Sequence, residues 1–168
     1  SVYQYFKIQS EGKLRYKNIV TAWFTTENER DYYTNPSSGR AIAAQLIREG
    51  LDALDAAGFD FQQCDADNNG VIDAVNLFYA GKRVNSWGEA FWPHKGDAFW
   101  DGFPRHGLSD TFQYQISDTP ENLGVGTFIH ESGHLICDFP DLYSYDPSAA
   151  ANIGAYSHMG ASRRTHPA

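Results

Sequence analysis

The pattern that most constrains this chain is a His-Glu-x-x-His sequence inside a stretch of helical periodicity. His130 and His134 stand four residues apart, with Glu131 directly after the first of them. On an α-helix this spacing places both imidazoles on one face, about one turn apart, so both can reach a single metal ion. Zinc prefers nitrogen ligands, and a catalytic zinc site keeps one position open for water. Glu131 is then the predicted general base, because it would accept the proton of that water.

The alternative is that the motif occurs by chance, which we expect in roughly one such chain in a hundred. Its placement on a helix favours a real site. Thr119, Pro120 and Glu121 form a helix start, with a capping hydroxyl, a Pro at the first helical position and an acid near the positive end of the dipole. We therefore predict a helix from Thr119 to about Cys137. Its expected apolar side consists of Leu123, Val125, Phe128, Ile129, Leu135 and Ile136.

The stretch from His130 to Tyr143 resembles the immune inhibitor A-like family of secreted bacterial metallopeptidases, whose motif reads HExGHxxGxPDLYD. Three other segments carry the same resemblance. Residues 1–14 are similar to the family's SVxxYYxxxSxGKL opening, with Phe6 in place of the second Tyr. Residues 60–81 resemble its DFxxxDxDxDGxVDxxxxxYAG segment, and residues 92–94 its WPH element. The similar segments are spread over most of the chain.

Two histidines do not complete a zinc site, and the resemblance implies an Asp as the third ligand. In this sequence Cys137 holds the family's Gly position, and the Asp comes one residue late. A sharp turn at Asp138 would compensate, because Asp tolerates a left-handed backbone better than most residues. Asp138 to Asp141 is then the family's three-residue step, which makes Asp141 the expected ligand. The rivals are Asp138 and, more distantly, Asp146, and the alternative for Asp141 is a solvated turn residue.

Beyond the ligands, the resemblance to metzincins implies a Met-turn that packs beneath the metal, made by Met159. Its neighbour His158 then has a structural place. Serralysin- and astacin-type metzincins carry a Tyr two residues past this Met, where this chain has Ala161. A donor to the developing oxyanion must come from elsewhere. Five candidates remain open: Tyr143, Tyr145, Tyr156, His94 and His106.

A second motif, residues 65–73, matches the first nine positions of an EF-hand calcium loop. Gly70 makes the bend, but Asn76 replaces the Glu expected at the twelfth position, and a strand follows where an EF-hand has a helix. A true EF-hand is excluded, and we hypothesise a calcium loop on another scaffold. The alternative is a turn whose Asx side chains bind their own backbone. The expected oxygen ligands are Asp65, Asp67, Asn69, Asp73 and the carbonyl of Val71.

The periodicity of the rest of the chain predicts an α+β (α/β-like) fold with a small mixed sheet, a helix packed on it and the motif helix below a cleft. The resemblance implies a metzincin-type domain. Residues 81–110, rich in Gly and aromatic side chains, suggest a surface region around the cleft. The other expected elements are a helix at 1–8, a strand at 19–24, an amphipathic helix at 41–57 ended by Gly58, a strand at 71–80 and a short edge strand at 111–116.

Composition narrows the class of protein. The chain has 168 residues, which suits one domain, and 13 Lys and Arg against 21 Asp and Glu give a net charge of -8. This charge argues against nucleic acid or an anionic membrane as a main partner. No apolar run approaches the ~18 residues of a membrane span. Cys64 and Cys137 are equally compatible with a disulfide and with two buried thiols.

We interpret residues 1–168 as a single metallopeptidase catalytic domain. The chain opens at Ser1 without an initiator Met or signal peptide, which suggests a processed or excised piece. It ends soon after Met159, where metzincins usually continue into another helix, so we expect truncation at the C-terminal end. The HExxH motif by itself indicates only metal-assisted hydrolysis.

The family resemblance implies a secreted, extracellular zinc metalloendopeptidase, with Zn²⁺ and a hypothesised Ca²⁺ as cofactors, that acts on protein or peptide substrates. We expect a monomer. The alternative is a non-catalytic secreted metal-binding module, or a decayed or incomplete peptidase domain. Glu131 distinguishes the two, because a purely structural zinc has no use for it.

Overall fold

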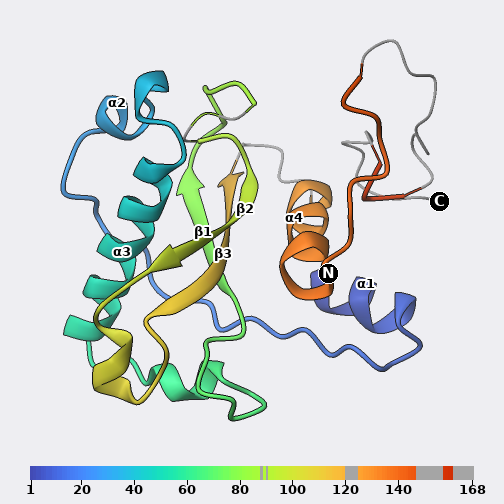
Figure 1. The fold of residues 1–168 in the computed structure, drawn as a ribbon, viewed down its shortest axis with the longest axis horizontal. Helices are drawn as coiled ribbons and strands as arrows, with labels where there is room; N and C mark the ends of the chain where they lie inside the picture. Colours follow the sequence, from blue (N-terminus) through green and yellow to red (C-terminus); the bar gives the residue numbers. More distant parts are fainter. Residues whose placement is uncertain (88, 90, 120–124, 147–156, 161–168) are drawn as a thin grey trace. The chain divides into compact units, whose positions relative to one another are not determined.

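The computed structural model of the chain describes residues 1–87, 89, 91–119, 125–146 and 157–160. Within them it has an α+β composition, with four α-helices and a three-stranded mixed sheet (Figure 1). The chain divides into two compact units. One comprises 1–23, 124–130 and 140–168, and the other comprises 24–123 and 131–139. The expected mixed α+β class is confirmed, while the metzincin type and the single catalytic domain stay predictions.

The sheet of the larger unit has the strand order β1-β3-β2. Its strands are β1 (Val75–Ala80), β2 (His94–Phe99) and β3 (Thr111–Thr119). β3 pairs in parallel with β1 and antiparallel with β2. The strand predicted at 111–116 is confirmed, but its edge position was wrong, since this segment is the central strand and runs on to Thr119. The strand expected at 71–80 begins only at Val75, because the preceding residues belong to a loop.

Helix α3 (Ala41–Ala56) confirms the amphipathic helix expected at 41–57. Figure 1 shows it running along the sheet. Its apolar stripe joins Tyr114 and Ile116 of β3 in the main hydrophobic cluster, and these two side chains are 3% and 0% exposed. Gly58 ends the helix with a φ of +74°, a conformation that suits glycine. The buried residues of α3 are Ile42, Ala43, Leu46, Ile47, Gly50 and Leu51.

Residues 81–110 contribute more to the core than the predicted surface region would. Trp100 and Phe103 are 1% and 0% exposed, and Phe91 and Leu108 are also buried. The indole Nε1 of Trp100 donates to Asp52 Oδ1 at 2.8 Å, which satisfies its polar atom. The segment also contains β2 and the 3-10 helix η3 (Phe103–His106), which packs near η2 (Phe61–Cys64). β2 was not predicted, because its sequence lacks a two-residue apolar alternation.

The N-terminal residues form α1 (Val2–Gln9), as the spacing predicted, with the Ser1 hydroxyl accepting from Gln4 N at its start. The strand expected at 19–24 was wrong. These residues have no regular secondary structure, and Val20 and Trp23 are 90% and 71% exposed. Local β-propensity does not hold a strand without a partner. Short elements follow at α2 (Arg30–Tyr33) and η1 (Pro36–Ser38).

The motif helix, α4, spans Gly126–Cys137. Its predicted end at Cys137 is confirmed, but its predicted start at Thr119 was wrong. Thr119 is the last residue of β3, and its hydroxyl donates to the carbonyl of Tyr79 at 2.8 Å, so sheet pairing outweighs the local capping signal. Leu123 lies outside the described residues. No helix in the described part of the chain is long and apolar enough to cross a membrane.

Candidate metal centre

Both histidines of α4 are oriented by backbone carbonyls. His130 Nδ1 lies 2.7 Å from the carbonyl oxygen of His158, and His134 Nδ1 lies 2.6 Å from that of Phe139. Because a carbonyl oxygen only accepts, both Nδ1 atoms carry the proton and donate it. In a neutral ring with this tautomer the lone pair is on Nε2, which is the arrangement of metal-binding histidines.

The carboxylate of Asp141 completes a cluster with these two rings. Its Oδ1 lies 3.1 Å from His130 Nε2. One ligand-type atom from each of His130, His134 and Asp141 lies within 4.8 Å of the others. Two ligands of a tetrahedral zinc ion are expected about 3.4 Å apart, from metal–ligand distances of about 2.1 Å. The donor set of two imidazoles and one carboxylate fits zinc, although ligation itself stays a prediction.

The turn after α4 has the left-handed backbone that was predicted for Asp138. Asp138 has a φ of +50°, in the left-handed region, which confirms the predicted turn. The amide of Phe139 donates to the carbonyl of Gly133 at 3.2 Å and closes this turn. The side chain of Asp138 is 88% exposed and lies 3.8 Å from Lys95 Nζ. Among the described acidic residues after α4, Asp141 joins the histidine cluster, whereas Asp138 and Asp146 do not.

The segment around Met159 contacts His130 and the residue that follows Asp141. Met159 and His158 are buried, at 6% and 5% exposure. The carbonyl of His158 accepts from His130, and that of Met159 accepts from Leu142 N at 2.7 Å. The ring of His158 contacts Tyr5 edge-on, with ring centroids 4.9 Å apart. His158 therefore holds the His130 ring through its backbone carbonyl, in keeping with the structural place expected for it.

Two of the five oxyanion candidates lie at the cluster. The Tyr145 hydroxyl donates to Asp141 Oδ2, and the Tyr143 ring stacks on His130 at 6.3 Å. Burial raises the pKa of Tyr143, and the neighbouring Asp141 carboxylate raises it further. The Tyr143 hydroxyl therefore remains protonated near neutral pH.

The other candidates are engaged elsewhere or not described. His94 Nδ1 donates to the carbonyl of Trp92 at 2.6 Å, and the Tyr114 hydroxyl donates to its Nε2 at 3.1 Å. Burial lowers the pKa of His94 to about 4, so it is neutral in the core. His106 contacts Asp55 at 2.8 Å. Tyr156 lies outside the described residues.

Glu131 is buried, at 7% exposure, and follows His130 directly on α4. The next residue, Ser132, is fully buried and accepts a hydrogen bond from Gln115 of β3 at 2.7 Å. This contact was not predicted from the sequence. The one signal for it was Asn76, a polar residue within the otherwise apolar strand β1.

The Asp-rich loop brings three carboxylates together. Ligand-type oxygens of Asp65, Asp67 and Asp73 lie within 4.8 Å of one another. Each also accepts from loop backbone: Asp65 from Asn69 and Gly70, Asp67 from Asn69, and Asp73 from Ala66. These bonds fit the Asx-turn alternative, while the gathered negative charge fits a bound cation. The calcium hypothesis, including the Val71 carbonyl, stays a prediction.

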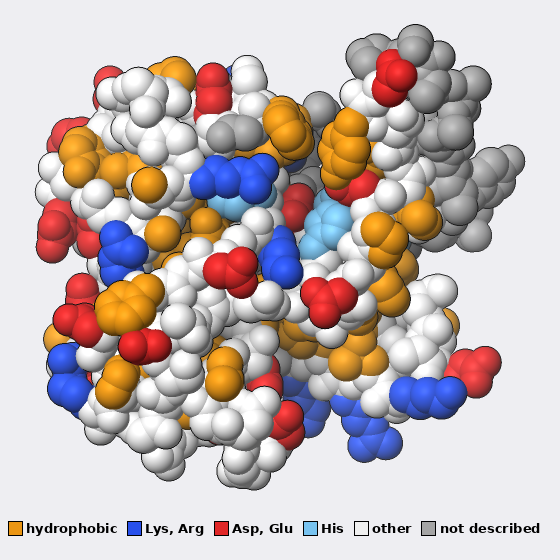
Figure 2. Space-filling model, in the orientation of Figure 1, with side chains coloured by type: hydrophobic (Ala, Val, Ile, Leu, Met, Phe, Trp, Pro, Cys, Tyr) orange, Lys and Arg blue, Asp and Glu red, His pale blue; other side chains and the backbone are white. Residues whose placement is uncertain are grey.

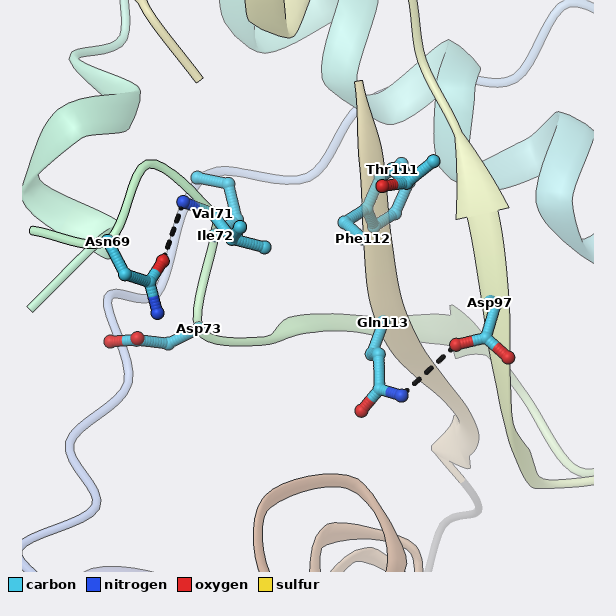
Figure 3. A pocket seen from close by; sticks show the side chains of 8 residues that line it. All are labelled: Asn69, Val71, Ile72, Asp73, Asp97, Thr111, Phe112 and Gln113. Atoms are coloured by element: carbon cyan, nitrogen blue, oxygen red, sulfur yellow. Dashed lines mark hydrogen bonds between the residues drawn. The ribbon is translucent and has the colours of Figure 1, made fainter. Parts of the chain in front are cut away.

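Beside this loop the larger unit has a pocket of about 350 Å³ (Figure 3). Loop and sheet both contribute to its wall, and on the sheet side Gln113 Nε2 donates to Asp97 Oδ1 at 3.1 Å. The lining residues are Asn69, Val71, Ile72, Asp73, Asp97, Thr111, Phe112 and Gln113. The pocket lies outside the histidine cluster, and we assign it no role in the chemistry.

Cys64 and Cys137 are both free thiols in this structure, and burial raises the pKa of each. Neither joins the histidine cluster. On the face shown in Figure 2, acidic and basic side chains are interspersed and do not gather into one basic area. Comparison of the chain with family models, with curated proteins and with solved structures finds no match.

Proposed function

We propose that this chain is a zinc-dependent endopeptidase that holds its metal through His130, His134 and Asp141. One observation carries the proposal: His130 Nε2 faces Asp141 Oδ1 at 3.1 Å while its Nδ1 donates to a carbonyl. In the neutral ring these are two acceptors turned toward each other, which is unfavourable unless a cation lies between them. A zinc ion would supply that cation, and His134 would supply a further nitrogen ligand.

The residues around the cluster support a division of roles. A bound zinc ion would polarise the carbonyl of the scissile bond and lower the pKa of a water molecule. Glu131 would take a proton from the attacking water and pass it to the leaving amine. Tyr145 would hold Asp141 through Oδ2, and the His158 and Phe139 carbonyls would hold the two imidazoles. The second partners of metal ligands have this orienting effect in known sites.

The substrate class rests on the family resemblance, which implies peptide bonds in protein or peptide substrates outside the cell. The rival is a non-catalytic metal-binding module. A buried carboxylate directly beside the first histidine is unnecessary for such a module, and it favours the enzyme. A metal-free rival also exists, in which His130 is protonated on both nitrogens and pairs with Asp141 as an ion pair.

Metal content and hydrolysis test the proposal together. We expect elemental analysis of the purified protein to find about one zinc per chain at the cluster, and a casein-type substrate to be hydrolysed. A chelator should abolish the hydrolysis, and added zinc should restore it. Bound zinc without any hydrolysis would favour the non-catalytic module. Absence of zinc, with no binding of added zinc, would favour the ion pair and overturn the proposal.

A further inference from the structure

A buried polar contact joins the central strand to the motif helix. Gln115 is 0% exposed, and its Nε2 donates to Ser132 Oγ at 2.7 Å and to Asn76 Oδ1 at 2.6 Å. Asn76 is the direct register partner of Gln115 in the parallel pair. Since side chains alternate along a strand, Gln115 faces away from the core side occupied by its neighbours Tyr114 and Ile116.

Ser132 occupies the face of α4 opposite the histidines. At 100° per residue, it lies about 160° from His134 and about 160° from His130 around the helix axis, taking the shorter way. Its neighbours on that face are apolar, since Ile129 and Leu135 are 3% and 5% exposed. The hydroxyl of Ser132 is therefore an isolated polar group within an apolar helix face.

Such an isolated polar pair specifies one rotation of the helix relative to the sheet. Apolar packing alone specifies the rotation of a helix less sharply, because cores of the right size and pattern lose uniqueness before they lose stability. A buried hydrogen bond is lost on such a rotation, and leaving the Gln115 amide without this acceptor costs about 1–3 kcal/mol. Single buried polar residues fix register in this way at helix interfaces.

We propose that the Gln115–Ser132 hydrogen bond fixes the rotation of α4 about its axis and thereby positions His130, Glu131 and His134. Gln115 and Ser132 are positioning residues, because their hydrogen bond lies on the side of α4 away from the histidines and acts through the helix backbone. The inference rests on the proposed zinc site. A rotated helix would move both imidazoles away from Asp141, so zinc affinity should fall even where the protein stays folded.

The test compares Ser132→Ala, Gln115→Met and the double variant with the unmodified protein. The measurements are the zinc Kd, by competition with a chelating dye, and the visible absorption of the cobalt-substituted protein. We expect each single variant to raise the zinc Kd about 10-fold, as losses of supporting contacts do. The double variant should raise it no further than the larger single effect, since both remove one contact.

Ser117→Ala is the matched control. Ser117 is two residues along β3 on the same face as Gln115, it is 2% exposed, and its Oγ has no hydrogen-bond partner in the described part of the structure. It should leave the zinc Kd and the cobalt spectrum unchanged. Ser132→Thr, which keeps the hydroxyl, should retain more zinc affinity than Ser132→Ala.

The outcomes separate positioning from simple stability. Lower denaturant midpoints for Ser132→Ala and Gln115→Met, with an unchanged zinc Kd and cobalt spectrum, would overturn the inference. If the unmodified protein binds no zinc, the proposed function fails. Amide hydrogen exchange then tests whether the Gln115–Ser132 bond fixes α4. Faster exchange across residues 130–134 in both variants, but not in Ser117→Ala, would support it, and unchanged exchange would overturn it.

Discussion

The carbonyl oxygen of Phe139 lies 2.6 Å from Nδ1 of His134, so the turn that ends α4 also orients the second histidine of the motif. Phe139 reaches this position because Asp138 adopts a positive φ of +50°. The same turn leads to Asp141 beside His130. One strained residue therefore influences both the orientation of His134 and the position of the Asp141 carboxylate.

The first prediction separates Asp141 from Asp138. Asp141→Ala should weaken zinc binding by at least about 100-fold, because loss of a supporting partner alone costs 10- to 100-fold. Asp138→Gly should bind zinc normally and be neutral to about 1 kcal/mol more stable, since glycine adopts this backbone without strain. Zinc Kd and urea unfolding measure the two effects. Asp146→Ala is the control with an exposed carboxylate, and a large loss in Asp138→Gly alone would reverse the assignment.

A second prediction concerns Glu131. Glu131→Gln preserves size and burial but removes the base, so hydrolysis of a casein-type substrate should fall about 10²- to 10⁴-fold. Zinc content and the thermal midpoint should stay close to those of the unmodified protein. The exposed Glu29 offers a matched control, and Glu29→Gln should keep full activity. Substantial activity in a zinc-loaded Glu131→Gln protein would remove Glu131 from the base role.

The third prediction addresses calcium at the Asp-rich loop. A cation that binds only the folded loop stabilises by mass action, by about 3 kcal/mol at a hundred times its Kd. Added calcium should therefore raise the thermal midpoint of the protein, measured by calorimetry with the zinc site saturated. Asp67→Ala should abolish that rise, whereas Asp101→Ala, outside the loop, should keep it. A midpoint insensitive to calcium in the unmodified protein would leave the Asx-turn interpretation.

The fourth prediction is a pH dependence of stability from His94. Burial lowers its pKa from 6.5 to about 4, so the unfolded chain binds a proton between these values that the folded protein does not. Stability contributed by neutral His94 is thus fully present above about pH 6.5 and is lost as the pH falls toward 4. The loss should approach about 3 kcal/mol.

Urea unfolding at several pH values between 4 and 7 measures this contribution. His94→Gln should be less stable than the unmodified protein at pH 7, because it disturbs the bonds to Trp92 and Tyr114. The difference should narrow as the pH falls. A constant difference across this range would show that His94 does not titrate as its burial requires.

The sequence predicted those parts of the fold whose signals are local. α1 and α3 follow from apolar spacing, and the end of α3 follows from Gly58. The segment at 19–24 has strand-forming residues but no partner, and Thr119 has a capping side chain but pairs with Ala80. Both errors have one cause, since strand pairing depends on residues distant in sequence.

The same division holds at the candidate site. The pair of His130 and His134 follows from helical spacing, and the turn at Asp138 follows from the backbone tolerance of Asp. The bond from Gln115 to Ser132 joins two elements whose approach no local pattern specifies, and the bond from Tyr145 to Asp141 lies in a segment without regular secondary structure. These supporting contacts could only be found in the folded chain.

The strand order also bears on how the chain folds during synthesis. Of the three strands in the described residues, β3 is made last but occupies the middle of the sheet, between β1 and β2. Neither outer strand has a ladder partner until Thr111–Thr119 leaves the ribosome, because β1 and β2 do not pair with each other. Such non-local pairing slows folding, and unpaired strand edges promote aggregation. A nascent chain stalled before Thr111 would therefore carry two unpaired strands, β1 and β2, and we expect it to bind chaperones.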